Sequence, residues 1–127
     1  MEFQRTFIAS ILLIAALALF AAGCGPSGPS RYDDFAKCLT EKGAVMYGTE
    51  WCPHCKTQKE LFGDSFKYVN YVDCDKNSGE CIAKGIEGYP TWIIGGGKYP
   101  GVQQFTTLKQ LSGCEIEPAA TEPASAQ

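Results

Sequence analysis

Apolar positions between Tyr32 and Gly113 switch repeatedly between the spacing of helices and the spacing of strands. Apolar residues three or four apart, closed by a stop signal such as glycine, are typical of helices, and short β-rich or alternating runs are typical of strands. The helical pattern predicts helices over residues 32–42, 53–62, 78–84 and 106–111. The strand pattern predicts strands over residues 44–48, 68–72, 91–94 and around 98–99. Helices and strands in this order predict one α/β layered domain.

The first 23 residues show a different pattern. Residues 7–22 are almost uninterruptedly apolar, which is short for a membrane span of about 20 residues but suits the core of a signal peptide. Small residues then lead into Cys24, which resembles the lipobox of bacterial lipoproteins, with Ala21 in the place of the usual aliphatic residue. The resemblance implies that residues 1–23 are a lipoprotein-type signal peptide and that Cys24 carries a lipid. An ordinary cleaved signal and an uncleaved anchor remain open.

Composition indicates the remaining boundaries. Residues 24–31 are rich in glycine, proline and serine, so we expect a flexible tether. Residues 32–114 carry the helix and strand pattern, and we expect the folded domain there. Residues 115–127 contain two prolines and several alanines, and we expect a disordered tail. Lipid on Cys24 would make the protein extracytoplasmic and anchored to the membrane.

The number of cysteines supports export. The chain has seven, and an odd number leaves one without a partner in an oxidising compartment. Lipid on Cys24 would leave six, which can pair completely, and export makes stable disulfides chemically plausible. The six are Cys38, Cys52, Cys55, Cys74, Cys81 and Cys114. The formal net charge of −3 gives no electrostatic reason to expect nucleic acid as a partner.

The most informative motif is Trp51-Cys52-Pro53-His54-Cys55, which stands between a predicted strand and a predicted helix. Free amide groups at the helix start, together with protonated His54, would favour the thiolate of Cys52, and a thiolate is the species that attacks a disulfide. Pro53 fits the first turn of that helix. A structural disulfide and half of a zinc site are the alternatives. Because the chain has one histidine and no second close cysteine pair, we expect no metal, and nothing indicates a cofactor.

The order of the predicted elements, with Cys52 and Cys55 after the first strand and Pro90 before the hairpin, resembles the thioredoxin fold. Longer motifs resemble the thioredoxin-like domain fused to bacterial and plant homologues of vitamin K epoxide reductase. They are Met46–Gly48, Trp51–Cys55, Gln58–Gly63, Gly85–Trp92 and Tyr99–Gln103. The resemblance covers roughly residues 35–113 and implies an α/β fold with a central mixed four-stranded sheet flanked by helices. The 127 residues contain no counterpart of the membrane enzyme, so the electron partner stays open.

The resemblance also implies roles for individual residues. In thioredoxin-like proteins the first cysteine, here Cys52, is exposed and nucleophilic. The second cysteine, here Cys55, is more buried and resolves the mixed disulfide. The matching proline, here Pro90, is cis and faces the cysteine pair. Its neighbours Tyr89 and Thr91 would then flank the substrate groove.

Other residues of the motif have less certain roles. Trp51 would pack either beside the active site or in the core. Pro53 and His54 between the cysteines resemble the motif of periplasmic disulfide-forming enzymes, which implies that they tune the pair. This favours oxidation of substrates over reduction.

Proton transfer at the buried thiol is not explained by the sequence. Many thioredoxins hold a buried acid six residues before the first cysteine, and that position is Met46 here. Glu50 and Lys56 are nearby, and we interpret them as solvated. The group that handles the proton of Cys55 therefore stays open.

The remaining four cysteines allow three pairings. Cys74 and Cys81 bracket a short loop and helix, so we favour their pairing. Cys38 and Cys114 lie at the edges of the apolar faces of the first and last helices, where a bridge would tie these helices together. A second redox relay formed by one of the two pairs is the alternative.

These observations predict an extracytoplasmic thiol–disulfide oxidoreductase that passes its Cys52–Cys55 disulfide to protein substrates. We expect a monomer that is reoxidised by a membrane partner of the vitamin K epoxide reductase type or an analogous one. The first alternative is the same chemistry in reverse, as a reductase or isomerase. The second is a non-catalytic binding domain in which all six cysteines are structural.

Overall fold

The computed structural model describes residues 30–117 of the chain. The predicted signal peptide, the lipidation site at Cys24, the tether up to residue 29 and the tail from residue 118 lie outside the described residues. Among the helices within the described range, none combines the length and the apolar character needed to cross a membrane.

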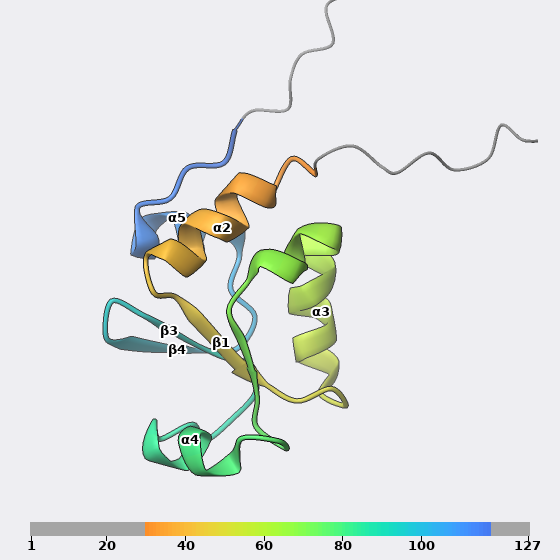
Figure 1. Ribbon diagram of the computed structural model, residues 1–127, viewed down its shortest axis with the longest axis vertical. Helices are drawn as coiled ribbons and strands as arrows, with labels where there is room; N and C mark the ends of the chain where they lie inside the picture. The colour runs from red at the N-terminus through yellow and green to blue at the C-terminus, as the bar shows by residue number, and fades with distance from the viewer. Residues whose placement is uncertain (1–29, 118–127) are drawn as a thin grey trace, which may run out of the picture.

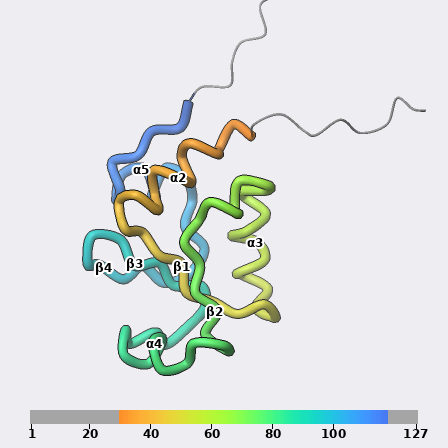
Figure 2. The backbone as a smooth tube through the Cα atoms, in the orientation of Figure 1, coloured from red at the N-terminus to blue at the C-terminus, as the bar shows by residue number. Residues whose placement is uncertain are grey.

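A mixed four-stranded sheet lies at the centre of the domain (Figures 1 and 2). The strands lie in the order β2-β1-β3-β4, and their bounds in that order are Tyr71–Asp73, Val45–Gly48, Thr91–Ile94 and Gly97–Pro100. Strands β1 and β2 are parallel, and β3 runs antiparallel to both β1 and β4. A parallel pair needs a crossover connection, and α3 with the segment after it supplies that connection.

Four α-helices flank the sheet in the described part of the chain. They are α2 (Asp33–Glu41), α3 (Pro53–Phe62), α4 (Ser78–Ala83) and α5 (Phe105–Ser112). Figure 1 shows α2 and α5 together at one end of the domain, α3 alongside the sheet and α4 at the opposite end. The sheet and its helices confirm the predicted fold class.

The predicted strand over residues 68–72 is wrong in its first half. A 3₁₀ helix, η2 (Gly63–Tyr68), follows α3, and β2 begins only at Tyr71. The side chain of Thr40 on α2 explains the difference, because it donates to the Tyr68 carbonyl at 2.7 Å and accepts from the Asn70 amide at 3.0 Å. These backbone groups are therefore held by a helix and not by a neighbouring strand.

The sheet separates two apolar clusters of unequal size. Side chains alternate between the faces of a strand, so Met46 on β1 and Trp92 beside it face one way while Tyr47 faces the other. The larger cluster consists of Phe35, Ala36, Leu39, Ala44, Met46, Cys52, Cys55, Phe62, Val69, Trp92, Ile94, Leu108 and Cys114. The smaller cluster consists of Tyr47, Cys74 and Cys81, with partly buried neighbours packed against it.

The ring of Phe62, the last residue of α3, connects the helices of the larger cluster to the sheet. Its centroid lies 4.8 Å from that of Phe105 on α5. It lies 6.1 Å from that of Phe35 on α2 and 6.1 Å from that of Trp92 on β3. Aromatic pairs at these separations add to the gain from burial. The position of α3, and with it the cysteine motif at its start, therefore depends on this cluster.

Each cluster has a disulfide. Cys38 on α2 pairs with Cys114, which follows α5. Cys74, directly after β2, pairs with Cys81 on α4. This is the pairing that the sequence favoured.

The predicted boundary of the tail lies too early. Ile116 packs against the larger cluster, and Glu115 makes an ion pair with Lys109 on α5 at 2.7 Å. The disulfide at Cys114 keeps the chain beside the domain, which brings these two residues into contact with it. At the other end, Ser30 already contacts Asp33 through two hydrogen bonds, so the tether prediction extends too far by at least this residue.

Candidate active site

Cys52 lies at the start of α3, immediately after the loop that leaves β1. It is the N-cap residue, with extended backbone angles, and its Sγ accepts a hydrogen bond from the Cys55 amide at 3.2 Å. Pro53 is the first residue of the helix and has no amide hydrogen to leave unpaired. The sulfur therefore stands where helix amides and the helix dipole stabilise negative charge.

The expectation that Cys52 is exposed is wrong. Cys52 is 4% exposed and Cys55 is 0% exposed, so both are buried, and Cys52 is the more accessible of the two. The physical reason is the hydrogen bond to the Cys55 amide, which turns the sulfur back over the first turn of α3. Neither cysteine takes part in a disulfide in this structure.

Cys55 lies directly over the end of β1. A Cβ atom added to Gly48 would stand 2.7 Å from Cys55 Sγ, which is closer than any side chain tolerates. Burial, and after it the hydrogen bond with Cys52, raises the pKa of the Cys55 thiol to about 12. The Thr49 backbone and the charge of Lys59 act in the opposite direction. Cys55 is therefore a thiol that holds its proton tightly.

The loop before β3 lies beside the cysteine motif. The Tyr89–Pro90 peptide bond is cis, as the resemblance implied. The rings of Tyr89 and Trp51 meet edge to face at a centroid distance of 6.2 Å. Thr91 donates its hydroxyl hydrogen to the Gly88 carbonyl at 2.8 Å, which closes the loop on itself. The structure thus brings Tyr89 next to Trp51, the residue before the predicted nucleophile, whereas the side chains of Pro90 and Thr91 are buried.

Trp51 is a surface residue. It is 64% exposed, and its indole nitrogen donates to the Asp75 carboxylate at 2.8 Å. The core tryptophan of this domain is Trp92. Of the two positions that the sequence left open for Trp51, the structure supports the one beside the cysteine pair.

Pro53 and His54, the two residues between the cysteines, both lie on the surface. The imidazole of His54 makes no hydrogen bond or ion pair with another residue in the range 30–117. The same range contains no group of three side chains suited to hold a metal ion.

Lys59, Glu50 and Tyr71 form a group behind Cys55 that was not predicted from the sequence, where Glu50 was interpreted as solvated. Lys59 makes an ion pair with Glu50 at 2.9 Å, and its Nζ lies 4.1 Å from the centroid of the Tyr71 ring on β2. Lys59 stands four residues after Cys55 on α3, which places both on one face of the helix. That spacing was visible in the sequence, but the contact with Tyr71 was not.

A second missed residue is Gln58, which is fully buried on α3. Its side-chain oxygen accepts from the Trp92 indole at 3.1 Å and from the Gln103 amide at 2.6 Å, and its nitrogen donates to the Gln103 carbonyl at 3.1 Å. These bonds hold the segment that follows β4 against the helix carrying the dithiol. All three residues stand in the motifs quoted for the resemblance, but those motifs did not indicate that the residues bond to one another.

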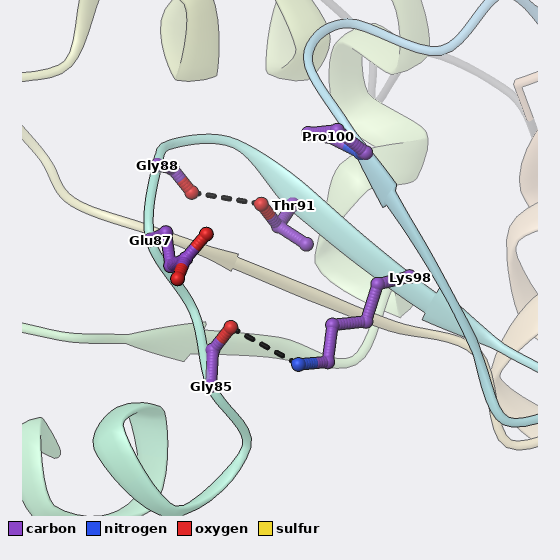
Figure 3. A pocket seen from close by; sticks show the side chains of 6 residues that line it. All are labelled: Gly85, Glu87, Gly88, Thr91, Lys98 and Pro100. Carbon is purple, nitrogen blue, oxygen red and sulfur yellow. Dashed lines mark hydrogen bonds between the residues drawn. The ribbon is translucent and has the colours of Figure 1, made fainter.

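A hollow of about 290 Å³ lies between the segment before β3 and strand β4 (Figure 3). It is lined by Gly85, Glu87, Gly88, Thr91, Lys98 and Pro100. Lys98 donates to the Gly85 carbonyl at 3.1 Å, and Figure 3 shows this bond across the hollow. Thr91 is the only predicted groove residue among the lining residues, and neither cysteine lines the hollow.

Comparison with known proteins finds relatives that are named as redox enzymes. No protein-family model matches the chain. Thiol-disulfide oxidoreductase LTO1 of Arabidopsis thaliana is 39% identical over 93 residues, which cover 66% of this chain and 25% of that protein. Protein disulfide-isomerase A3 of Gallus gallus is 32% identical over 103 residues, which cover 74% of this chain and 20% of that protein. The chain thus spans a quarter or less of the length of these curated relatives.

Among solved structures, oxidised mitochondrial thioredoxin 3 of Saccharomyces cerevisiae matches with a TM-score of 0.44 and 18% identity. The match covers 62% of this chain and 86% of that chain. The class of the domain follows from its own topology: a β2-β1-β3-β4 sheet with two cysteines at the start of the helix after β1. This is a thioredoxin-like domain.

Proposed function

We propose that this protein is a thiol–disulfide oxidoreductase that transfers its Cys52–Cys55 disulfide to reduced protein substrates. A substrate thiolate attacks Cys52 Sγ, the Cys52–Cys55 bond breaks, and Cys55 leaves as a thiolate and takes up a proton. A second substrate thiolate then attacks the substrate sulfur of the mixed disulfide. The substrate disulfide forms, and Cys52 leaves as a thiolate. The two substrate thiols lose two electrons and two protons; the Cys52–Cys55 disulfide takes up the two electrons, Cys55 takes up one proton, and the other proton goes to solvent.

The position of Cys52 carries this proposal. Its sulfur caps α3 and accepts the Cys55 amide at 3.2 Å, so a negative charge on Cys52 meets an N–H group and the positive end of a helix. A stabilised thiolate is a good leaving group, and it also favours the reduced dithiol over the disulfide. The names of the two relatives, an oxidoreductase and a disulfide isomerase, support the same chemistry.

A substrate chain would lie across Trp51 and the Pro90 loop. The exposed indole of Trp51 and the half-buried ring of Tyr89 offer an apolar surface next to Cys52. Apolar side chains of an unfolded or partly folded protein suit such a surface. The proposed substrates are therefore reduced proteins, with the groove formed by Trp51, Tyr89, Pro90 and Thr91.

The motif supports one direction of transfer. Pro53 and His54 between the cysteines resemble those of disulfide-forming enzymes, so the proposed role is oxidation of substrates. The test is the reduction potential of the dithiol in glutathione buffers. An oxidant should have a potential above about −200 mV, whereas a value near −270 mV would favour the reductase alternative.

The proposed location is outside the cytoplasm, with lipid on Cys24 holding the chain at the membrane. A membrane enzyme of the vitamin K epoxide reductase type, or an analogous one, would reoxidise the dithiol. The leader and the odd number of cysteines support this location. Expression of the full chain in a Gram-negative bacterium with labelled palmitate tests it. The wild type should carry the label in the membrane fraction, and Cys24→Ala should carry none.

The experiment for the activity uses oxidised full-length protein and reduced, unfolded ribonuclease. Wild type should transfer its disulfide and restore ribonuclease activity, and Cys52→Ser should transfer none. Cys55→Ser cannot form the Cys52–Cys55 disulfide and should likewise transfer none. The control is the double variant Cys74→Ser with Cys81→Ser, which removes two sulfurs but keeps the motif and should still transfer. Equal activity of Cys52→Ser and wild type would overturn the proposal.

A further inference from the structure

A cation stands behind the resolving cysteine and has no role in the steps described so far. Lys59 Nζ makes an ion pair with Glu50 at 2.9 Å and lies over the face of the Tyr71 ring at 4.1 Å from its centroid. The Lys59 side chain is 22% exposed and that of Glu50 is 62% exposed, so the ammonium group is the sheltered partner. The ring of Phe66 lies on the cation as well, at 5.4 Å.

The ring of Tyr71 links this cation to the thiol. The point at which a Cβ of Gly48 would stand is 2.7 Å from Cys55 Sγ and 3.4 Å from Cε2 of Tyr71. One edge of the ring therefore reaches the surroundings of the sulfur, while its face carries the ammonium group. Lys59 also lies one helical turn after Cys55 and on the same side of α3.

The buried thiol needs such a charge. Cys55 must be a thiolate both when it resolves a mixed disulfide and when it leaves in the opposite direction. A negative charge in a site without solvent is costly unless an opposite charge is close. The position at which many thioredoxins hold a buried acid is Met46, which is fully buried and carries no ionisable group.

Among the groups that affect the pKa of Cys55, Lys59 is the one that carries a positive charge. The titratable neighbours of Cys55 are Cys52 and Lys59 from α3 and Tyr71 from β2, and Tyr71 is in turn affected by the charges of Glu50 and Asp73. Glu50 comes from the loop before the motif. Asp73 makes its own ion pair with Lys76 at 3.1 Å.

We propose that Lys59 is a positioning residue for the redox reaction, held by Glu50 and the Tyr71 ring so that its charge stabilises the thiolate of Cys55. The inference rests on the proposed function. In the resolving step, Cys55 releases its proton to solvent and the thiolate attacks Cys52 of the mixed disulfide. The Cys52–Cys55 bond forms, and the departing thiolate takes up a proton from solvent. In the reverse direction, the same charge stabilises Cys55 as the leaving group.

The electrostatics of Cys55 agree with this placement. Burial raises its pKa most, the hydrogen bond with Cys52 adds to the rise, and the charge of Lys59 lowers it. The hydroxyl of Tyr71 is closed off from solvent and meets no hydrogen-bond partner in the described part of the chain. Burial is the main cause of the raised pKa of Tyr71, and the charge of Glu50 is the next. The ring therefore stays neutral between the cation and the thiol.

The test uses the Cys24→Ala chain, which lacks the one other thiol, with its dithiol reduced and its two structural disulfides intact, and dithiobis-nitrobenzoate; all variants are made in this background. Attack by Cys52 releases one coloured thiolate, and attack by Cys55 on the mixed disulfide releases the second. Lys59→Met keeps most of the length and the apolar contacts of the side chain but removes the charge. We expect the first phase unchanged and the second slower by about threefold to tenfold, because a rise of one pKa unit lowers the thiolate fraction and is partly offset by higher nucleophilicity.

Two controls separate a charge effect from loss of structure. Lys59→Arg should restore the second phase, because it returns a cation to the Tyr71 ring. Lys56→Met removes an exposed lysine from the same helix and should leave both phases unchanged. The pH profile of the second phase should move to higher pH in Lys59→Met and return in Lys59→Arg.

The outcomes distinguish this inference from the proposed function. A second phase of Lys59→Met whose pH profile coincides with that of the wild type would overturn the role of Lys59 and leave the function intact. A wild type that releases no coloured thiolate at all would overturn the proposed function and, with it, this inference. A slow second phase in Lys56→Met as well would also count against a specific role for Lys59.

Discussion

The two faces of the sheet are held in different ways. The larger cluster joins three helices to β1 and β3 through many apolar side chains, with Phe62 in contact with rings from α2, α5 and β3. The smaller cluster has three buried members, and two of them are the cysteines of one disulfide. The face with little apolar surface therefore relies on a covalent bond.

The difference explains where the dithiol lies. Both Cys52 and Cys55 belong to the larger cluster, which holds α3 in place and keeps water from the second sulfur. Tyr89 packs against both clusters, so the Pro90 loop lies where the two meet. A rigid helix on one side and a loop on the other is a common arrangement for a site that binds a variable partner.

The largest expected effect comes from opening the long-range disulfide. Cys38–Cys114 joins residues 76 apart, and Cys74–Cys81 joins residues seven apart. By the chain-entropy model the first stabilises the fold by about 4.5 kcal/mol and the second by about 2.4 kcal/mol. Urea unfolding of the two double serine variants measures both. A larger loss from the Cys74–Cys81 pair would contradict the entropic account and show that the smaller face depends on its bridge for packing.

Next in size is the loss of the ring at the centre of the larger cluster. Phe62→Ala should lower the free energy of unfolding by about 3 to 5 kcal/mol, because a fully buried aromatic ring leaves a cavity. Val72→Ala, which truncates a half-buried side chain against the smaller cluster, should cost about 1 kcal/mol. Thermal and urea unfolding of both variants give the ratio of the two losses in the free energy of unfolding. Equal losses would mean that the two faces do not differ as described.

Glycine substitutions should have opposite signs on the two faces. Gly48→Ala should destabilise the protein by about 1 to 3 kcal/mol, because the new Cβ would overlap Cys55 Sγ. Gly79→Ala on α4 meets open space and should stabilise the protein by up to about 1 kcal/mol through helix propensity. The same unfolding measurements apply. A neutral Gly48→Ala would show that the sulfur can move aside.

The last expected effect is absent near neutral pH and appears only in the alkaline range, as a change in the pH dependence of stability. The folded Cys55 thiol holds its proton up to about pH 12, against an ordinary value of 9.0. Because the unfolded chain loses this proton first, the contribution is complete below pH 9 and declines as the pH rises towards 12. Reduced wild type should lose up to about 1.4 kcal/mol per pH unit more than Cys55→Ala in this window. If the free energies of unfolding of the two proteins fell in parallel between pH 9 and 12, the raised pKa of Cys55 would be contradicted.

Local patterns in the sequence were enough for most of the fold. Pro53 and Gly63 mark the ends of α3, and a helix over residues 53–62 was predicted from them and found. The first half of the predicted strand over residues 68–72 failed because its backbone bonds come from Thr40, 28 to 30 residues away. No local pattern carries a contact of that range.

The cysteine pair was identified by its spacing, but its surroundings were not. Gly48 approaches Cys55 closely, and the ammonium group of Lys59 lies over the Tyr71 ring. Both contacts join residues that meet only after folding. The small exposure of Cys52 depends on one side-chain rotation, which brings its sulfur to the Cys55 amide. A sequence motif gives the type of residue at a position and not the direction of its side chain.

Alkylation by iodoacetamide near neutral pH, mapped by mass spectrometry, tests the central claim most directly in the Cys24→Ala chain with its dithiol reduced and its two structural disulfides intact. The dithiol account predicts one label per folded chain, on Cys52, with Cys55 labelled only after unfolding. A folded chain in which Cys52 resists the reagent, or in which Cys55 reacts first, would contradict it.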